Sequence, residues 1–138
     1  MNLLLEIITP EKIVFKDEID EAVIPTANGQ ITILPNHVGL LTQIKPGELI
    51  VKKGNKREYL AITDGFLEIN NNHISILANY AIKAEDIQVA EQKEAQERAE
   101  KLMREKLTDR DARIAEAQLI QAVLQMQIAS KHRQRNIH

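Results

Sequence analysis

The stretch ISILANYAIKAEDI, residues 74–87, separates two kinds of sequence in this chain. Every glycine, proline, phenylalanine and tyrosine lies at or before Tyr80, and the apolar runs between them are short. Beyond Tyr80 the chain is dominated by strong helix formers such as Ala, Glu, Gln, Lys, Arg and Leu. The break predicts an α+β chain, with a β-domain over residues 1–83 and a helical part over residues 84–138.

The first part reads as a series of short strands separated by turn residues. Pro10, Pro25 and Pro35 are each expected to end a strand, and Asn28-Gly29 is a hairpin signal because both residues tolerate positive φ. Turn signals at intervals of roughly 8–12 residues are typical of an antiparallel sandwich or barrel. The expected strands cover residues 2–9, 19–24, 30–34, 48–52, 57–63, 66–69 and 73–78, with a short apolar pair at 14–15.

The second part reads as two amphipathic helices. The first is expected to begin at Ala84-Glu85-Asp86, where acidic residues favour a helix N-terminus, and residues 108–111 are expected to form a turn. The second runs from about residue 111 to about residue 131, so the pair makes an antiparallel hairpin. An interface of alanine against alanine between the two helices buries little area. The hairpin is therefore expected to be marginally stable alone, and to separate from the sandwich without unfolding it. Its apolar rows are Ala112, Ala115, Leu119, Ala122, Met126 and Ala129, and Ile120, Leu124 and Ile128.

Composition excludes several classes of partner. With 18 basic and 20 acidic residues the net charge is −2, so no bulk field attracts nucleic acid or anionic lipid. Two Tyr, two Phe and no Trp provide no stacking platform for single-stranded nucleic acid. No apolar stretch approaches the roughly 20 residues that span a bilayer, and the N-terminus lacks the basic segment of a signal peptide. We expect a soluble chain whose only membrane link is through its partners.

The sequence contains no known arrangement of catalytic residues. The histidines, His37, His73, His132 and His138, have no metal-ligand spacing, and the chain has no cysteine. The sequence contains no phosphate-binding glycine loop and no nucleophile elbow. We therefore expect a binding or coupling module that is not an enzyme, with no metal and no cofactor.

One segment, NGQITILPNH at residues 28–37, combines a hairpin turn with a proline-ended strand, and turn chemistry alone explains each of its residues. Together with other segments in the same order, it resembles the epsilon subunit of F-type ATP synthases. The resemblance covers the whole chain. It is carried by residues 29–37 (GQITILPNH), 8–10 (ITP), 64–69 (DGFLEI), 74–78 (ISILA) and 84–87 (AEDI).

The resemblance implies a non-catalytic subunit of the rotating central stalk, held between the gamma subunit and the c-ring. It implies that Gly29, Gln30, Leu34, Pro35, Asn36 and His37 contact the c-ring and the foot of gamma. The helical hairpin is expected to lie folded, or to extend into the alpha/beta hexamer and brake ATP hydrolysis. The residues expected to meet an acidic region of beta are Arg110, Arg113, Lys131, Arg133 and Arg135. The location would be peripheral, on the cytoplasmic face of a bacterial plasma membrane or the stromal face of a thylakoid.

One departure from the family concerns nucleotide binding. Some bacterial members bind ATP in the folded hairpin through an Ile/Leu-Asp-x-x-Arg-Ala motif. Here Gln88 replaces the aspartate and Glu91 replaces the arginine. Because Glu91 would repel a phosphate that the arginine attracts, we expect no ATP binding through this motif.

A second hypothesis belongs to another class. The chain could be a free-standing small-molecule-binding β-sandwich with a helical dimerisation tail. That reading predicts a homodimer through residues 112–129 and no contact with gamma.

Overall fold

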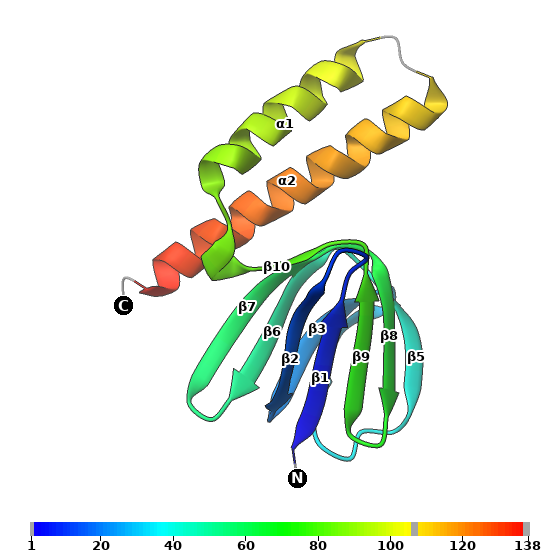
Figure 1. Cartoon of the computed structure of the whole chain (residues 1–138), viewed down its shortest axis with the longest axis vertical. Helices are drawn as coiled ribbons and strands as arrows, with labels where there is room; N and C mark the ends of the chain where they lie inside the picture. Colours follow the sequence, from blue (N-terminus) through cyan, green and yellow to red (C-terminus); the bar gives the residue numbers. More distant parts are fainter. Residues whose placement is uncertain (1, 106–107, 137–138) are drawn as a thin grey trace. The chain divides into compact units, whose positions relative to one another are not determined.

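The computed structural model describes residues 2–105 and 108–136. The chain divides into two compact units, Met1–Lys83 and Ala84–His138, the first built of strands and the second of helices (Figure 1). The expected fold class, an N-terminal β-sandwich followed by a two-helix hairpin, is confirmed.

In the described part of the first unit, ten strands form one sheet in the order β10-β7-β6-β3-β5-β8-β9-β1-β2, and β4 pairs with β3. Every pair is antiparallel except β1 with β9, which is parallel. The sheet closes around one core, because β2 at one end lies near β6 and β10 at the other. The strands are β1 (Leu3–Ile8), β2 (Ile13–Ile19), β3 (Glu21–Thr26), β4 (Gly29–Ile33), β5 (Leu40–Ile44), β6 (Gly47–Lys53), β7 (Lys56–Ile62), β8 (Gly65–Asn70), β9 (His73–Ala78) and β10 (Ala81–Lys83).

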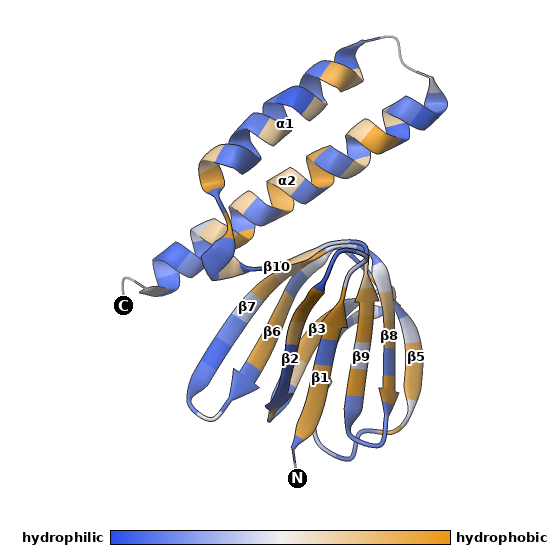
Figure 2. Cartoon of the chain, viewed as in Figure 1, coloured by the Kyte–Doolittle hydropathy of each residue, from blue (hydrophilic) through white to orange (hydrophobic). Residues whose placement is uncertain are grey.

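The core follows from alternation along the strands. In β1, Leu3, Leu5 and Ile7 are fully buried, whereas the intervening residues are only partly buried. The same period of two runs through β3, β6, β8 and β9, and Figure 2 shows apolar and polar positions alternating along the sheet. Each fully buried leucine or isoleucine contributes about 1.5–3 kcal/mol. Such residues include Ile24, Ile33, Ile44, Leu49, Leu60, Ile62, Leu67, Ile74 and Ile76.

The expectation that Pro25 ends a strand is wrong, since it lies within β3. In an antiparallel strand the nitrogen and carbonyl oxygen of one residue point to the same side. The Pro25 oxygen accepts a hydrogen bond from the Lys45 nitrogen at 3.2 Å. On that side the partner of β3 changes from β6 to β5, so the missing N–H removes no ladder hydrogen bond.

Two further boundaries differ from expectation. The run over residues 19–24 is interrupted at Asp20, which separates β2 from β3 and accepts a hydrogen bond from the Gly54 nitrogen at 2.7 Å. No strand was expected between Pro35 and Glu48, but β5 lies there and joins β3 to β8. The short β10 was also not expected, and it pairs with the end of β7.

The second unit contains a 3₁₀ turn, η1 (Ala84–Asp86), and two α-helices, α1 (Val89–Arg104) and α2 (Asp109–Asn136), among its described residues. The first α-helix therefore begins later than expected, since η1 is followed by Gln88, which is extended and is the N-cap of α1. The second begins at Asp109 because Thr108 is its N-cap. The Thr108 Oγ1 accepts from the Asp111 nitrogen at 3.2 Å, and the Thr108 oxygen accepts from the Ala112 nitrogen.

The two α-helices lie antiparallel and pack along a seam of small residues. Ala99 of α1 and Ala115, Ala122 and Ala129 of α2 are buried. This confirms the expected alanine seam at those positions, whereas Ala112 is exposed. Larger apolar side chains remain exposed on the same helices, among them Leu102, Met103, Ile114 and Ile120.

Candidate partner-binding surfaces

The β3–β4 hairpin presents the first pair of expected contact residues. Thr26 is buried, and its Oγ1 donates to the Gly29 oxygen at 2.5 Å and accepts from the Asn28 nitrogen at 3.2 Å. Thr26 pairs with Gly29, so the loop consists of Ala27 and Asn28, one position earlier than Asn28-Gly29. Gly29 has a φ of 113°, which favours glycine. Gln30 beside it is exposed.

The other four expected contact residues lie beyond the opposite end of β4. Leu34 and Asn36 are exposed, whereas Pro35 and His37 are partly buried. The His37 Nδ1 lies 2.7 Å from the Val38 oxygen, so the ring is held against its own loop. Leu34 lies four positions after Gln30 along the strand direction, a distance of roughly 13 Å. The structure therefore places the expected contact residues at the two ends of β4, and they do not form one cluster.

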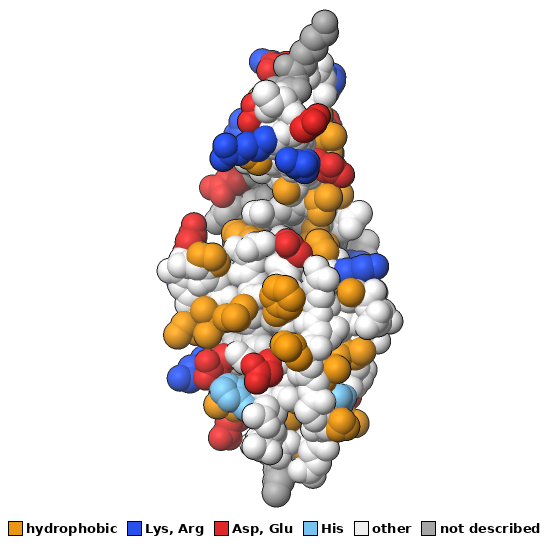
Figure 3. Space-filling model, turned by 90° about the vertical axis from the view of Figure 1, so that its right-hand side faces the viewer, with side chains coloured by type: hydrophobic (Ala, Val, Ile, Leu, Met, Phe, Trp, Pro, Cys, Tyr) orange, Lys and Arg blue, Asp and Glu red, His pale blue; other side chains and the backbone are white. Residues whose placement is uncertain are grey.

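A third surface was not predicted from the sequence. Leu41, Phe66 and Leu77 project from the neighbouring strands β5, β8 and β9 and are 72%, 60% and 55% exposed. Phe66 and Leu77 are directly paired, and the row continues to Ile8 of β1. Figure 3 shows hydrophobic side chains gathered on this side of the β unit. A depression of about 390 Å³ opens beside Phe66, Leu77 and Pro10.

A signal for this surface exists in the sequence. In β8, Leu67 and Ile69 point to the core, so Phe66 shares the outward face with Glu68. An aromatic residue at an outward position of an alternating strand is unusual for a solvated face. Exposed apolar patches rimmed by polar residues mark surfaces that bind other proteins.

The expected inhibitory residues form two groups at opposite ends of α2. Arg110 and Arg113 lie in its first turns and Lys131, Arg133 and Arg135 near its end, and all five are exposed. The 21 residues from Arg110 to Lys131 span roughly 31 Å of helix. The C-terminal group lies in a segment with no acidic residue after Glu116. This end of α2 is therefore a cationic surface.

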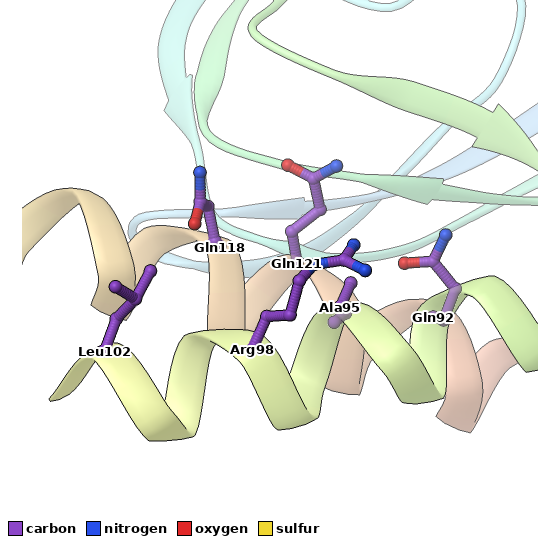
Figure 4. A pocket seen from close by; sticks show the side chains of 7 residues that line it. Gln92, Ala95, Arg98, Leu102, Gln118 and Gln121 are labelled. Carbon is purple, nitrogen blue, oxygen red and sulfur yellow. The ribbon is translucent and has the colours of Figure 1, made fainter. Parts of the chain in front are cut away.

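The helical pair also contains a groove of about 280 Å³ (Figure 4). Its lining is mostly polar amide and small apolar side chains, with Arg98 as the single cation among the described lining residues. Arg98 is also 4.0 Å from Glu94. Gln88 and Glu91 do not line this groove. The lining residues are Gln92, Ala95, Arg98, Leu102, Gln118, Gln121 and Ala122.

The Asp17–Lys53 ion pair on the β unit is exposed. The Lys53 Nζ lies 2.8 Å from Asp17 Oδ2, and the Glu18 nitrogen donates to Asp17 Oδ1 at 2.8 Å. The Lys53 hydrogen bond, followed by that of Glu18, lowers the pKa of Asp17. The same contact raises the pKa of Lys53. The described residues contain no group of three or more acidic or histidine side chains able to hold a metal.

No helix in residues 2–105 and 108–136 combines the length and the apolar character needed to cross a membrane.

His73 Nε2 lies 3.4 Å from Glu6 Oε1 on the outward face of β9 and β1. That pair borders the apolar row and gives it a polar rim.

The fold and its surfaces define a class of small protein, a β-sandwich with a C-terminal helical hairpin, whose prominent surfaces are suited to binding other proteins. The model of the ATP synthase delta/epsilon chain β-sandwich domain matches residues 2–84. The chain belongs to this family.

Individual relatives match over nearly the whole chain. The ATP synthase epsilon chain of Desulforamulus reducens is 41% identical, over 91% of this chain and 95% of its own length. That of Herpetosiphon aurantiacus is 38% identical, over 98% and 99%. A chain in the cryo-EM structure of the Euglena gracilis mitochondrial ATP synthase has a TM-score of 0.64 at 21% identity, covering 99% of this chain and 82% of that chain. This last likeness shows the shared fold. The expected resemblance to the epsilon subunit is confirmed.

Proposed function

We propose that this chain is a non-catalytic central-stalk subunit of a proton-translocating F-type ATP synthase. The observation that carries the proposal is the match to relatives named ATP synthase epsilon chain across both units of the chain. The β unit couples the c-ring to gamma, and the helical pair restrains ATP hydrolysis. The subunit is peripheral and reaches the membrane only through the complex, at the cytoplasmic face of a bacterial plasma membrane or the stromal face of a thylakoid.

In this proposal the β unit makes three contacts. Gly29 and Gln30 at one end of β4, and residues 34–37 at the other, contact the c-ring and the foot of gamma. The apolar face formed by Leu41, Phe66 and Leu77 binds gamma, since a permanent partner must cover an apolar surface of this kind.

Replacing Phe66 by serine tests the apolar face. We expect Phe66→Ser to weaken binding to gamma by about 2 kcal/mol or more, because buried aromatic anchors dominate such interfaces. The measurement is retention of the chain on the immobilised gamma-containing complex. Met103→Ser is the matched control, since Met103 is an exposed apolar residue of α1. Equal retention of both variants and the unsubstituted chain would remove this face from the interface.

The cationic end of α2 is proposed to meet an acidic region of the beta subunits when the helical pair extends. The triple change of Lys131, Arg133 and Arg135 to glutamine should relieve inhibition of ATP hydrolysis by about tenfold, if three exposed ion pairs of about 0.5 kcal/mol each are lost. Hydrolysis by the reconstituted catalytic sector measures this. Lys93→Gln on α1 is the charge control. Unchanged inhibition by the triple variant would assign the brake to other residues, with Arg110 and Arg113 the next to change.

The proposal includes no nucleotide sensing through the motif position at residues 87–92. Gln88 and Glu91 replace the acidic and basic residues of the nucleotide-binding motif, and Glu91 is exposed with no phosphate-binding cation in its place. Titration of the isolated chain with MgATP, followed by calorimetry, should give no saturable heat. Tight, saturable binding would contradict this part of the proposal.

A further inference from the structure

The turn that follows β4 has a defined type. Residues Leu34–His37 form a four-residue turn, closed by a hydrogen bond from the His37 nitrogen to the Leu34 oxygen at 3.2 Å. Its second residue is Pro35, whose ring fixes φ near −65°. Its third residue, Asn36, has a φ of +66°. Negative φ followed by positive φ identifies a type II turn.

The hydrogen bond of Asn36 depends on that turn type. Type I and type II turns differ in the direction of the peptide between the second and third residues, here the Pro35–Asn36 peptide. Its N–H belongs to Asn36 and donates to the Asn72 Oδ1 at 2.6 Å. A flip to type I turns this N–H away, so the contact is formed in one turn type and lost in the other.

Asn72 is itself fixed to the sheet. It lies in the turn between β8 and β9, and its carbonyl oxygen accepts from the Leu4 nitrogen of β1 at 2.8 Å. The next residue, His73, begins β9 and is paired with Leu4. The Asn72 Nδ2 also donates to Asn36 Oδ1 at 3.4 Å. A side chain anchored to two paired strands therefore holds a turn that is 36 residues away in the sequence.

We propose that Asn72 is a positioning residue, which holds the Leu34–His37 turn in its type II form. The turn orients the exposed side chains of Leu34 and Val38 toward a partner. The inference rests on the proposed function, in which residues 34–37 contact the c-ring and the foot of gamma. It goes further by naming the residue, outside the contact segment, that sets the conformation of that segment.

The first test examines the turn in the full-length isolated chain. Asn72→Gly removes the side chain and keeps a residue that adopts positive φ freely, as Asn72 requires at 62°. Asn72→Asp keeps the acceptor for the Asn36 N–H. Asn71→Gly is the matched control, because Asn71 is in the same turn with a φ of 49°.

Amide hydrogen exchange of Asn36, followed by NMR, should accelerate roughly threefold to tenfold in Asn72→Gly, the factor that corresponds to one hydrogen bond. It should stay within twofold of the unsubstituted chain in Asn72→Asp and Asn71→Gly. An Asn36 amide that remains equally protected in Asn72→Gly overturns the proposal.

The second test uses the cognate complex depleted of this subunit. Proton pumping in vesicles, divided by the rate of ATP hydrolysis so that the brake does not affect it, is measured as variants are added back. Asn72→Gly should need roughly threefold to tenfold more protein for half-maximal pumping than Asn71→Gly or Asn72→Asp.

The outcomes separate this inference from the proposed function. An equal loss in Asn72→Gly and Asn71→Gly, or a matching fall in their unfolding midpoints, overturns the positioning role. Failure of the unsubstituted chain to support pumping overturns the proposed function, and the exchange measurement still decides whether Asn72 sets the turn.

Discussion

At the scale of single residues, Gly65 sets how closely β8 and β9 approach at their shared end. A Cβ built there would overlap the Leu77 carbonyl oxygen and lie 2.8 Å from the Ala78 Cα, and both are backbone atoms. Gly65→Ala should therefore lower the free energy of unfolding by about 1–3 kcal/mol, as overpacking does. Urea denaturation measures the change.

Gly39→Ala is the control for that measurement. A Cβ at Gly39 would meet the Ile69 oxygen at 3.5 Å, an ordinary contact. We expect a change within about 0.5 kcal/mol. Similar stabilities for the two alanine variants would show that the β8–β9 end can spread without loss.

The Asp17–Lys53 pair makes a prediction about pH. Lys53→Met removes the hydrogen bond that lowers the Asp17 pKa, so that pKa should return toward its ordinary value of 3.8. A carboxyl group with a lowered pKa adds stability above its ordinary pKa and loses it as pH falls through the lowered value. The pair is exposed, so the effect on stability is small and screened by salt.

Carbon-detected NMR titration of Asp17 measures its pKa. Lys56→Met is the charge-matched control, since Lys56 begins β7 opposite Lys53, and it should leave the Asp17 pKa nearly unchanged. An Asp17 pKa that is the same in Lys53→Met and the unsubstituted chain would mean that the ion pair does not form in solution.

At the scale of elements, the helical pair contains a buried polar side chain. Gln125 is 1% exposed, and neither its Nε2 nor its Oε1 has a hydrogen-bond partner among the described residues. Gln125→Met should raise the free energy of unfolding by about 1–3 kcal/mol, because it removes an unsatisfied amide of similar volume. Thermal unfolding measures this, with the exposed Gln127→Met as control. A less stable Gln125→Met would show that the amide is satisfied in solution.

Most elements could be predicted from local sequence, and the failures have local causes. Short apolar runs bounded by turn residues identified β1, β6, β7, β8 and β9, because each strand places apolar side chains in the core and ends at a turn. The prediction that Pro25 ends a strand was wrong because β3 can contain a proline at the point where its partner strand changes from β6 to β5. The parallel pairing of β1 with β9 joins segments about 70 residues apart, which no local pattern encodes.

At the scale of the whole molecule, the sequence indicated the family but not the arrangement of its contact residues. The resemblance selected residues 29–37 as one segment. The fold places Gly29 and Gln30 at one end of β4 and residues 34–37 at the other, and it separates the five arm residues in the same way along α2. The face of Leu41, Phe66 and Leu77 was missed because it exists only through the register of β5, β8 and β9.

The oligomeric state of the isolated chain follows from the same account. In the proposed function, the apolar face and the helical arm bind gamma and the alpha/beta hexamer, which leaves no role for a second copy. Gel filtration with light scattering should give a mass near 15.7 kDa. A homodimer that is lost on deletion of residues 112–129 would favour the free-standing binding module with a dimerisation tail.

The measurement that tests the central claim most directly is ATP hydrolysis by the cognate catalytic sector depleted of this subunit. Either the full chain or a version ending at Lys83 is added back. The account predicts that both bind and that only the full chain slows hydrolysis, because the β unit binds the stalk and the helical pair is the brake. If neither version binds, the assignment of this chain to the central stalk is contradicted. If both bind and neither slows hydrolysis, the proposal that the helical pair inhibits hydrolysis is contradicted.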